Sequence, residues 1–262
     1  MTGVPSDPRP FRLYGHRGAA AHHPENTLRS FRAAIDAGVD AIETDVRLCA
    51  DGEVAVFHDA DGQRTCGEPV AVRSCRWATV AGWDAGDGER PIRLSDLLEA
   101  FPTTFLNIDV KDADPAAAEA VVAAVRRAGA ADRVGLGSFH RLTARAIRRA
   151  GWTGQLALTP REVAAVRLAG PAARWWVDGT AAQIPVAGGG FRLDGERFVA
   201  RCHALGLRVD YWTIDDPDTA LALVARGADG LVTNDPARIR AALTGRAAAA
   251  PPPGTPPGSP RR

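Results

Sequence analysis

Segments of strand length that are rich in apolar residues alternate with segments of helical period along most of this chain. This alternation is typical of a parallel sheet whose strands are joined by crossover helices. The expected strands are 12–15, 41–46, 54–58, 104–110, 134–138, 156–159, 182–186, 209–214 and 230–233. The expected helices are 27–37, 95–101, 115–128, 143–150, 161–169, 195–205, 217–226 and 236–243.

The regular repeat predicts an α/β fold, a single (β/α)8 barrel of the TIM type. Glycines that suit a left-handed helix cap follow several expected helices: Gly38, Gly129, Gly151, Gly206 and Gly227. A chain of 262 residues, 45% of them hydrophobic, is long enough for one such domain. Nine candidate strands compete for eight barrel positions, so one is expected to be an irregular loop. Segments 156–159 and 182–186 have the weakest flanking signals.

Two segments interrupt the repeat. Segment 60–93 is polar and rich in glycine, and we expect an insertion after the third strand that acts as a lid or binding loop. The end of the chain, 247–262, consists of small residues, six prolines and a terminal arginine pair. Such a composition cannot bury apolar surface, so we expect a disordered tail. The predicted organisation is one barrel domain over 1–246 followed by this tail.

Composition excludes several classes of protein. The 32 basic and 31 acidic residues give a net charge of +1, which does not indicate a nucleic-acid partner. The first ten residues contain no apolar signal segment, and no run is long enough for a transmembrane helix. We therefore expect a soluble, cytoplasmic protein. The four cysteines have no C-x-x-C spacing and are expected to be reduced thiols. The oligomeric state is left open.

Several residues that could take part in catalysis lie at or near the carboxyl ends of the predicted strands. They are His16, Glu43, Asp45, His58, Asp109 and Lys111. In a TIM-type barrel these ends meet at one mouth, so the side chains are expected to converge there. Glu43 and Asp45 lie two residues apart and point to the same side of their strand. Together with Asp109 they form an all-oxygen set that suits Mg²⁺ or Ca²⁺, whereas zinc is disfavoured because no His/Cys cluster has ligand spacing.

The motifs in this order resemble those of the glycerophosphodiester phosphodiesterases. They are His16-Arg17-Gly18, Pro24-Glu25-Asn26-Thr27, Glu43-Thr44-Asp45, Val56-Phe57-His58-Asp59 and Trp212-Thr213-Ile214-Asp215. The resemblance extends from about Arg12 to about Leu243. It implies metal-dependent hydrolysis of a small glycerophosphodiester to sn-glycerol 3-phosphate and an alcohol. It also implies metal binding by Glu43, Asp45 and Asp109, but the family more often has Glu in the third place, which leaves the preferred metal open.

Cleavage of a phosphodiester requires neutralisation of its charge, activation of a nucleophile and protonation of the leaving alcohol. The metal, Arg17 and Lys111 meet the first need, and Lys111 is the only lysine in the chain. His16 and His58 meet the other two as general acid and base, in an order that the sequence leaves open. The resemblance suggests that Trp212 lines the glycerol site, although a core position is almost equally compatible with its place after a strand.

Three residues near these motifs receive a structural interpretation. Glu25 and Asn26 are expected to order the start of the first helix. Asn234 stands where the family usually has Asp, and we expect it to affect the turn into the last helix rather than the chemistry.

Two alternative functions remain. One is a lysophospholipase D or sphingomyelinase D-like phosphodiesterase on the same barrel, which would need an apolar channel that the polar insertion does not indicate. The other is a catalytically silent phosphate-binding module, against which the intact His16 and His58 argue.

Overall fold

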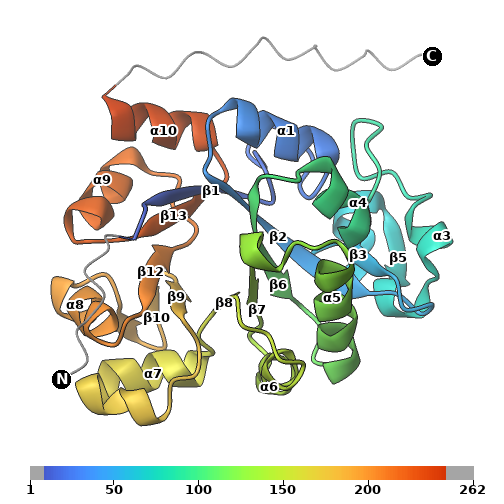
Figure 1. Cartoon of the computed structure of the whole chain (residues 1–262). Helices are drawn as coiled ribbons and strands as arrows, with labels where there is room; N and C mark the ends of the chain where they lie inside the picture. Colours follow the sequence, from blue (N-terminus) through green and yellow to red (C-terminus); the bar gives the residue numbers. More distant parts are fainter. Residues whose placement is uncertain (1–8, 246–262) are drawn as a thin grey trace.

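Eight parallel strands surround the centre of the molecule (Figure 1). The computed structural model describes residues 9–245. The strands are β1 (Arg12–His16), β2 (Ala41–Leu48), β6 (Phe105–Val110), β7 (Val134–Gly137), β8 (Gln155–Leu156), β9 (Ala181–Ile184), β12 (Arg208–Tyr211) and β13 (Gly230–Thr233). Their order is β8-β7-β6-β2-β1-β13-β12-β9, and a parallel bridge between Ala157 and Ala181 links the two ends. The predicted TIM-type barrel is confirmed.

The ninth candidate strand is β3 (Val54–Val56), which lies outside the ring of parallel strands. It pairs antiparallel with β2, so that Arg47 lies opposite Ala55. The expectation that 156–159 or 182–186 would be an irregular loop is wrong, because these segments supply β8 and β9. The physical reason is the length of the connection: five residues join β2 to β3, whereas a parallel crossover needs about a dozen or more.

The expected helices pack around the outside of the barrel (Figure 1). They are α1 (Leu28–Asp36), α4 (Leu94–Ala100), α5 (Pro115–Arg127), α6 (Arg141–Arg149), α7 (Pro160–Ala169), α8 (Glu196–Ala204), α9 (Pro217–Ala225) and α10 (Pro236–Thr244). An Asp-Pro pair begins three of them, and each aspartate accepts a hydrogen bond from a backbone N–H in the first turn: Asp114, Asp216 and Asp235. Proline at the first helical position needs no such partner, so the pair defines a sharp helix start.

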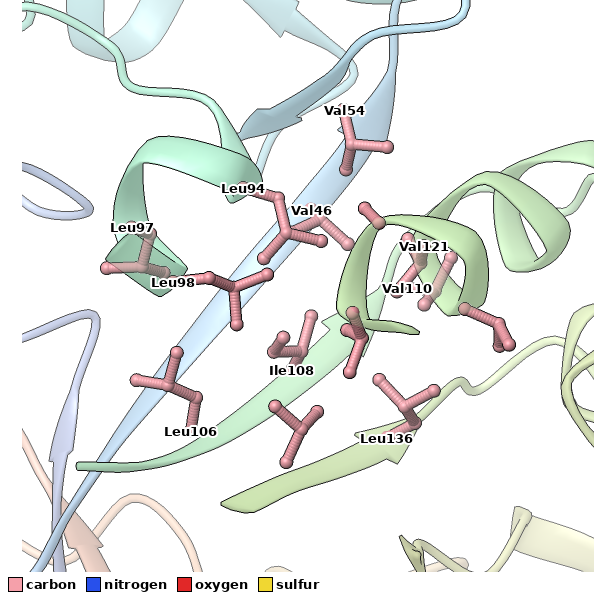
Figure 2. Close-up of a cluster of buried hydrophobic side chains, with 14 of the residues drawn as sticks. Val46, Val54, Leu94, Leu97, Leu98, Leu106, Ile108, Val110, Val121 and Leu136 are labelled. Atoms are coloured by element: carbon pink, nitrogen blue, oxygen red, sulfur yellow. The ribbon is translucent and has the colours of Figure 1, made fainter. Parts of the chain in front are cut away.

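Alternation along the strands decides which side chains face the barrel interior. Leu106, Ile108 and Val110 of β6 point outward and pack beneath α4 and α5 (Figure 2). Because successive strand residues point to opposite faces, Asn107 and Asp109 point inward. Burial of one such leucine or isoleucine contributes about 1.5–3 kcal/mol. The outward apolar residues therefore fix the direction of the inward polar ones.

The insertion lies between β3 and α4, as expected. It contains short elements: β4 (Asp61–Gly62), α2 (Gln63–Cys66), β5 (Glu68–Ala71), η1 (Val72–Ser74) and α3 (Trp77–Val80). A small apolar cluster that includes Phe57, Val72 and Trp83 packs it against the β3 region. All four cysteines are free thiols, as expected.

Two expectations remain, one on membrane-spanning helices and one on the end of the chain. No helix in residues 9–245 combines the length and the apolar character needed to cross a membrane. The segment 247–262, for which we expect disorder, lies outside the described residues.

Candidate active site

The strand register sets four of the predicted residues opposite one another in two pairs on neighbouring strands. In the pairing of β1 with β2, His16 lies opposite Glu43. In the pairing of β2 with β6, Asp45 lies opposite Asp109. Lys111 follows β6, and its Nζ lies 2.9 Å from Asp45 Oδ1 and 2.7 Å from Asp109 Oδ2. The predicted convergence at the carboxyl ends of neighbouring strands is therefore present in the structure.

Asp45 lies at the centre of this cluster. Its Oδ2 lies 2.9 Å from Arg17 Nε, and its Oδ1 contacts Lys111. Burial acts to raise the pKa of Asp45, but the charges of Lys111 and Arg17 outweigh it and the pKa is lowered. Asp45 is thus kept ionised between two cations.

The loop after β1 positions Arg17 through an unusual backbone conformation. Arg17 and Asn26 have φ angles of 52° and 59°, a region that costs a non-glycine residue about 1–2 kcal/mol. Gly18 is required there, because a Cβ would lie 2.3 Å from Ser30 Oγ.

We expected Glu25 and Asn26 to order the start of α1, but the N-cap of that helix is Thr27, whose side chain accepts from the backbone N–H of Ser30. Glu25 accepts a hydrogen bond from Arg17 at 2.9 Å. Asn26 accepts one from Thr44 at 2.8 Å, and its Nδ2 lies 3.4 Å from Asp45 Oδ2. Both residues therefore help to hold the cluster.

Glu43 is the least compensated carboxyl group of the cluster. It is buried, and its Oε2 has no hydrogen-bond partner among the described residues. Burial and the neighbouring Asp45 raise its pKa well above the ordinary value. A bound cation would relieve this lack of positive charge.

The donor chemistry of Glu43, Asp45 and Asp109 fits a hard divalent cation. Within residues 9–245, however, no three His, Cys, Asp or Glu side chains form a ready metal-binding arrangement. The Lys111 ammonium lies between Asp45 and Asp109 and supplies part of the charge that a cation would bring. Burial raises the pKa of Asp109, against the opposing effect of Lys111. A cation would share these carboxylates with Lys111.

His58 lies shortly after β3, and residues of the following insertion hold its side chain in place. Its Nδ1 lies 2.6 Å from Asp59 Oδ1, and Asp59 Oδ2 accepts a hydrogen bond from Arg64 Nε at 2.6 Å. The hydrogen bond from Arg64 lowers the pKa of Asp59 to about 2. Arg64, on α2, also donates two hydrogen bonds to Glu25, at 2.7 and 2.9 Å. Sequence reasoning missed Arg64, because no local pattern indicates where α2 would pack.

His16, at the end of β1, has a different kind of partner. Its Nδ1 lies 2.7 Å from Asn234 Oδ1, and its Nε2 lies 3.8 Å from Glu43 Oε2. Burial lowers the pKa of His16. We expected Asn234 to affect the turn into the last helix rather than the chemistry, and the structure adds that its side chain contacts His16 directly and is itself bound by Asp215. In a closed barrel the last strand, β13, lies beside β1, and this neighbourhood could have indicated the contact between Asn234 and His16.

Trp212 stands directly after β12, at the same mouth. Its ring meets that of Phe139 edge to face, with 6.0 Å between the centroids. Lys111 Nζ lies 5.7 Å from the centroid of the Phe139 ring. Trp212 also packs against the interior cluster of Tyr14, Ala41 and Val232. Trp212 therefore packs against the core and also forms part of an aromatic wall beside Lys111. The sequence was compatible with both a core position and a position at the site.

A TIM-type barrel with acidic, basic and imidazole groups gathered at the ends of β1, β2 and β6 is suited to a hydrolase of phosphoric diesters. The match to a family model makes this specific: residues 16–238 match the glycerophosphoryl diester phosphodiesterase family, and the chain belongs to that family. The family generally depends on a divalent metal ion.

Individual relatives agree with this assignment. The chain is 33% identical to "Probable glycerophosphodiester phosphodiesterase 2" of Mycobacterium tuberculosis, covering 90% of this chain and 94% of that protein. It is 26% identical to a glycerophosphodiester phosphodiesterase of Caldanaerobacter subterraneus, covering 86% and 94%.

Two solved structures share the fold. A glycerophosphodiester phosphodiesterase of Agrobacterium tumefaciens has a TM-score of 0.77 at 23% identity, covering 89% of this chain and 99% of that chain. A phosphodiesterase of Oleispira antarctica, solved with the product sn-glycerol-3-phosphate, has a TM-score of 0.76 at 22% identity, covering 89% and 96%.

Proposed function

We propose that this protein hydrolyses glycerophosphodiesters to sn-glycerol 3-phosphate and an alcohol by acid–base catalysis with His16 and His58. One observation carries the assignment of the histidines. Each of them binds another side chain through Nδ1, at 2.7 Å for His16 and 2.6 Å for His58. Each is therefore left with Nε2 for the reaction. Membership of the family and the product complex of the Oleispira antarctica relative support the substrate class.

Charge neutralisation falls to the groups around Asp45. Arg17 and Lys111 are the cations that would bind the phosphate oxygens; both lie 2.9 Å from Asp45, one of the proposed metal ligands. Mg²⁺ or Ca²⁺ held by Glu43, Asp45 and Asp109 would supply further positive charge to the phosphate. Trp212 and Phe139 form the apolar wall beside this position and would contact the carbon skeleton of the glycerol.

The partners of the two histidines favour one order of roles. His16 pairs with a neutral amide, and burial lowers its pKa, so it is suited to begin as the neutral base that takes a proton from the nucleophile. His58 pairs through Nδ1 with Asp59, which its low pKa keeps as a carboxylate, so an anion lies against the ring of His58 where only a neutral amide lies against that of His16. His58 is thus suited to protonate the leaving alcohol.

Substrates with different leaving groups test these roles. We expect His16→Ala to lower kcat by about two to four orders of magnitude on both glycerophosphocholine and glycerophospho-p-nitrophenol. His58→Ala should cause a similar loss on glycerophosphocholine and a far smaller one on the nitrophenyl ester, because nitrophenolate leaves without a proton. His203→Ala, on α8, is the matched control and should retain turnover. Near-normal turnover of His16→Ala would remove it from the mechanism, and the opposite leaving-group pattern would exchange the two roles.

A substrate panel separates the alternatives. Purified protein is assayed with glycerophosphocholine, glycerophosphoethanolamine and a lysophospholipid, each with EDTA and with metal added back. Faster turnover of the lysophospholipid would favour a lysophospholipase D or sphingomyelinase D-like enzyme. No turnover of any substrate would favour a silent phosphate-binding module. Preferential, EDTA-sensitive hydrolysis of a glycerophosphodiester is the result that we expect.

A further inference from the structure

We propose that Asp215 and Asn234 are positioning residues that fix His16 in the tautomer with its proton on Nδ1, so that Nε2 presents its lone pair to the substrate. The inference rests on the proposed role of His16 as a base. Neither residue touches the position assigned to the phosphate, and both act through His16.

The direction of the hydrogen bonds follows from Asp215. Its Oδ1 accepts from the backbone N–H of Asn234 at 2.7 Å and from the Thr233 hydroxyl at 2.8 Å. Its Oδ2 lies 2.7 Å from Asn234 Nδ2. An asparagine side chain has a donor end and an acceptor end, and the carboxylate selects which of them faces it. The NH₂ end of Asn234 therefore faces Asp215, and its Oδ1 faces His16.

The same logic assigns the proton on His16. Asn234 Oδ1 lies 2.7 Å from His16 Nδ1, and a carbonyl oxygen can only accept. Nδ1 therefore carries the proton, and the neutral ring keeps its lone pair on Nε2. Nε2 points toward the cluster, 3.8 Å from Glu43 Oε2. This tautomer is the one that a base acting through Nε2 requires.

Three neighbouring strands hold the relay rigidly. His16 ends β1, Asn234 follows β13, and Asp215 lies shortly after β12. The strands β12, β13 and β1 are adjacent in the barrel, with Tyr211 opposite Leu231 and Gly15 opposite Thr233. The backbone N–H of Ile214 also donates to Val232 at 2.8 Å. The relay thus consists of strand ends that the barrel fixes relative to one another.

The isosteric variant Asp215→Asn should invert the relay. The oxygen of the new amide must face the backbone N–H of residue 234, which leaves its NH₂ facing the side chain of Asn234. Asn234 then turns its oxygen toward that NH₂ and its own NH₂ toward His16. His16 Nδ1 must accept, so the proton moves to Nε2 and the lone pair is lost from the reacting side.

¹⁵N NMR of histidine-labelled protein in the presence of Mg²⁺ reads the tautomer directly. Wild-type His16 should be protonated on Nδ1, and Asp215→Asn should move the proton to Nε2 and lower kcat at least about 100-fold. The double variant Asn234→Asp/Asp215→Asn restores an acceptor facing His16 and should recover the tautomer and most of kcat. The signals of His58, which pairs with Asp59, are the internal control.

The outcomes separate the two proposals. An unchanged His16 tautomer in Asp215→Asn overturns the relay, whatever the activity. An inverted tautomer with wild-type kcat supports the relay and overturns the role of His16 as base. If Asp215→Asn does not fold, Asn234→Ala tests the same point, because loss of the acceptor should produce a mixture of tautomers. A single Nδ1–H form in that variant also overturns the relay.

Discussion

Lys111 contacts two carboxylates and an aromatic ring of the site, so its role is more than that of a single positive charge. Its ammonium lies 2.9 Å from Asp45 Oδ1 and 2.7 Å from Asp109 Oδ2, beside the face of Phe139. Burial acts to lower its pKa, but Asp109 and Asp45 outweigh burial and raise it. Lys111 therefore stays protonated in a narrow space between two carboxylates. The remaining 31 basic residues of the chain are all arginine, so the single lysine is located where a compact cation is needed.

We predict that Lys111→Arg lowers kcat/KM for glycerophosphocholine at least about tenfold, equal to about 1.4 kcal/mol of transition-state stabilisation. The planar, five-donor guanidinium would crowd the carboxylates of Asp45 and Asp109, which the compact ammonium contacts at 2.9 and 2.7 Å. Arg73→Lys, an exposed exchange in the insertion, is the matched control and should retain kcat/KM. Wild-type kcat/KM in Lys111→Arg would show that the site requires only a charge.

At the scale of residues, the sequence predicted the groups that lie on or directly after strands. His16, Glu43, Asp45 and Asp109 follow from alternation along a strand and from the convergence of strand ends. The position of Arg64 could not be predicted in the same way, and neither could the contact of Asp215 with Asn234, although Asp215 directly follows the expected strand 209–214. Arg64 reaches Glu25 and Asp59 only because of how the insertion packs. The contact of Asn234 with His16 joins residues 218 positions apart.

Among the elements, helix boundaries were the most predictable because their signals are local. The Asp-Pro starts of α5, α9 and α10 each combine a cap with a residue that lacks the unsatisfied N–H. The nature of β3 was harder to predict, since its apolar residues are equally compatible with a barrel strand. Only the short connection from β2 distinguishes the antiparallel pairing.

The start of α7 depends on Glu162. Its carboxylate accepts hydrogen bonds from the backbone N–H and the hydroxyl of Thr159, both at 2.7 Å. It also accepts from the N–H of Asp178 at 2.9 Å and from Arg148 on α6 at 2.8 Å. Burial acts to raise the pKa of Glu162, but these hydrogen bonds outweigh it and lower the pKa. Because the folded pKa is depressed, this stabilisation is present above the unfolded pKa of about 4.3 and is lost as the pH falls through the folded value.

We predict that Glu162→Gln lowers the free energy of unfolding at pH 7 by about 1–3 kcal/mol, because the amide NH₂ would meet donors. The difference from wild type should begin to narrow as the pH falls below the unfolded pKa of about 4.3, and it should narrow further as the pH passes through the lower folded pKa of Glu162. Urea unfolding followed by circular dichroism at pH 7 and at acid pH measures both effects. Glu196→Gln, at the exposed start of α8, should change little. A loss of equal size at both pH values would contradict the linkage.

For the molecule as a whole, the repeat of strand and helix made the barrel predictable, and closure of the barrel produces the site. Closure places β13 beside β1, which brings Asn234, the residue directly after β13, to His16. The bridge between Ala157 and Ala181 joins the other two edges. The insertion could not be predicted in detail, because its short elements have no sustained period and depend on a small cluster around Phe57 and Trp83. The repeat of strands and helices in the sequence therefore predicts the general fold, whereas the complete site forms only when the barrel closes.

The closed mouth also couples metal binding to the stability of the whole molecule, because the proposed ligands come together only in the folded chain. We predict that Mg²⁺ or Ca²⁺ at about 100 times its Kd adds about 2.7 kcal/mol to the free energy of unfolding and raises Tm by about 5–10 °C. EDTA should reverse the shift.

The variants Glu43→Gln and Asp45→Asn test the proposed ligands, and calorimetry should show weaker metal binding in both. Both variants should regain part of their activity at raised metal concentration. Asp96→Asn, at an exposed carboxylate on α4, is the control and should behave as wild type. Unchanged metal affinity in both Glu43→Gln and Asp45→Asn would exclude this carboxylate pair as the ligands.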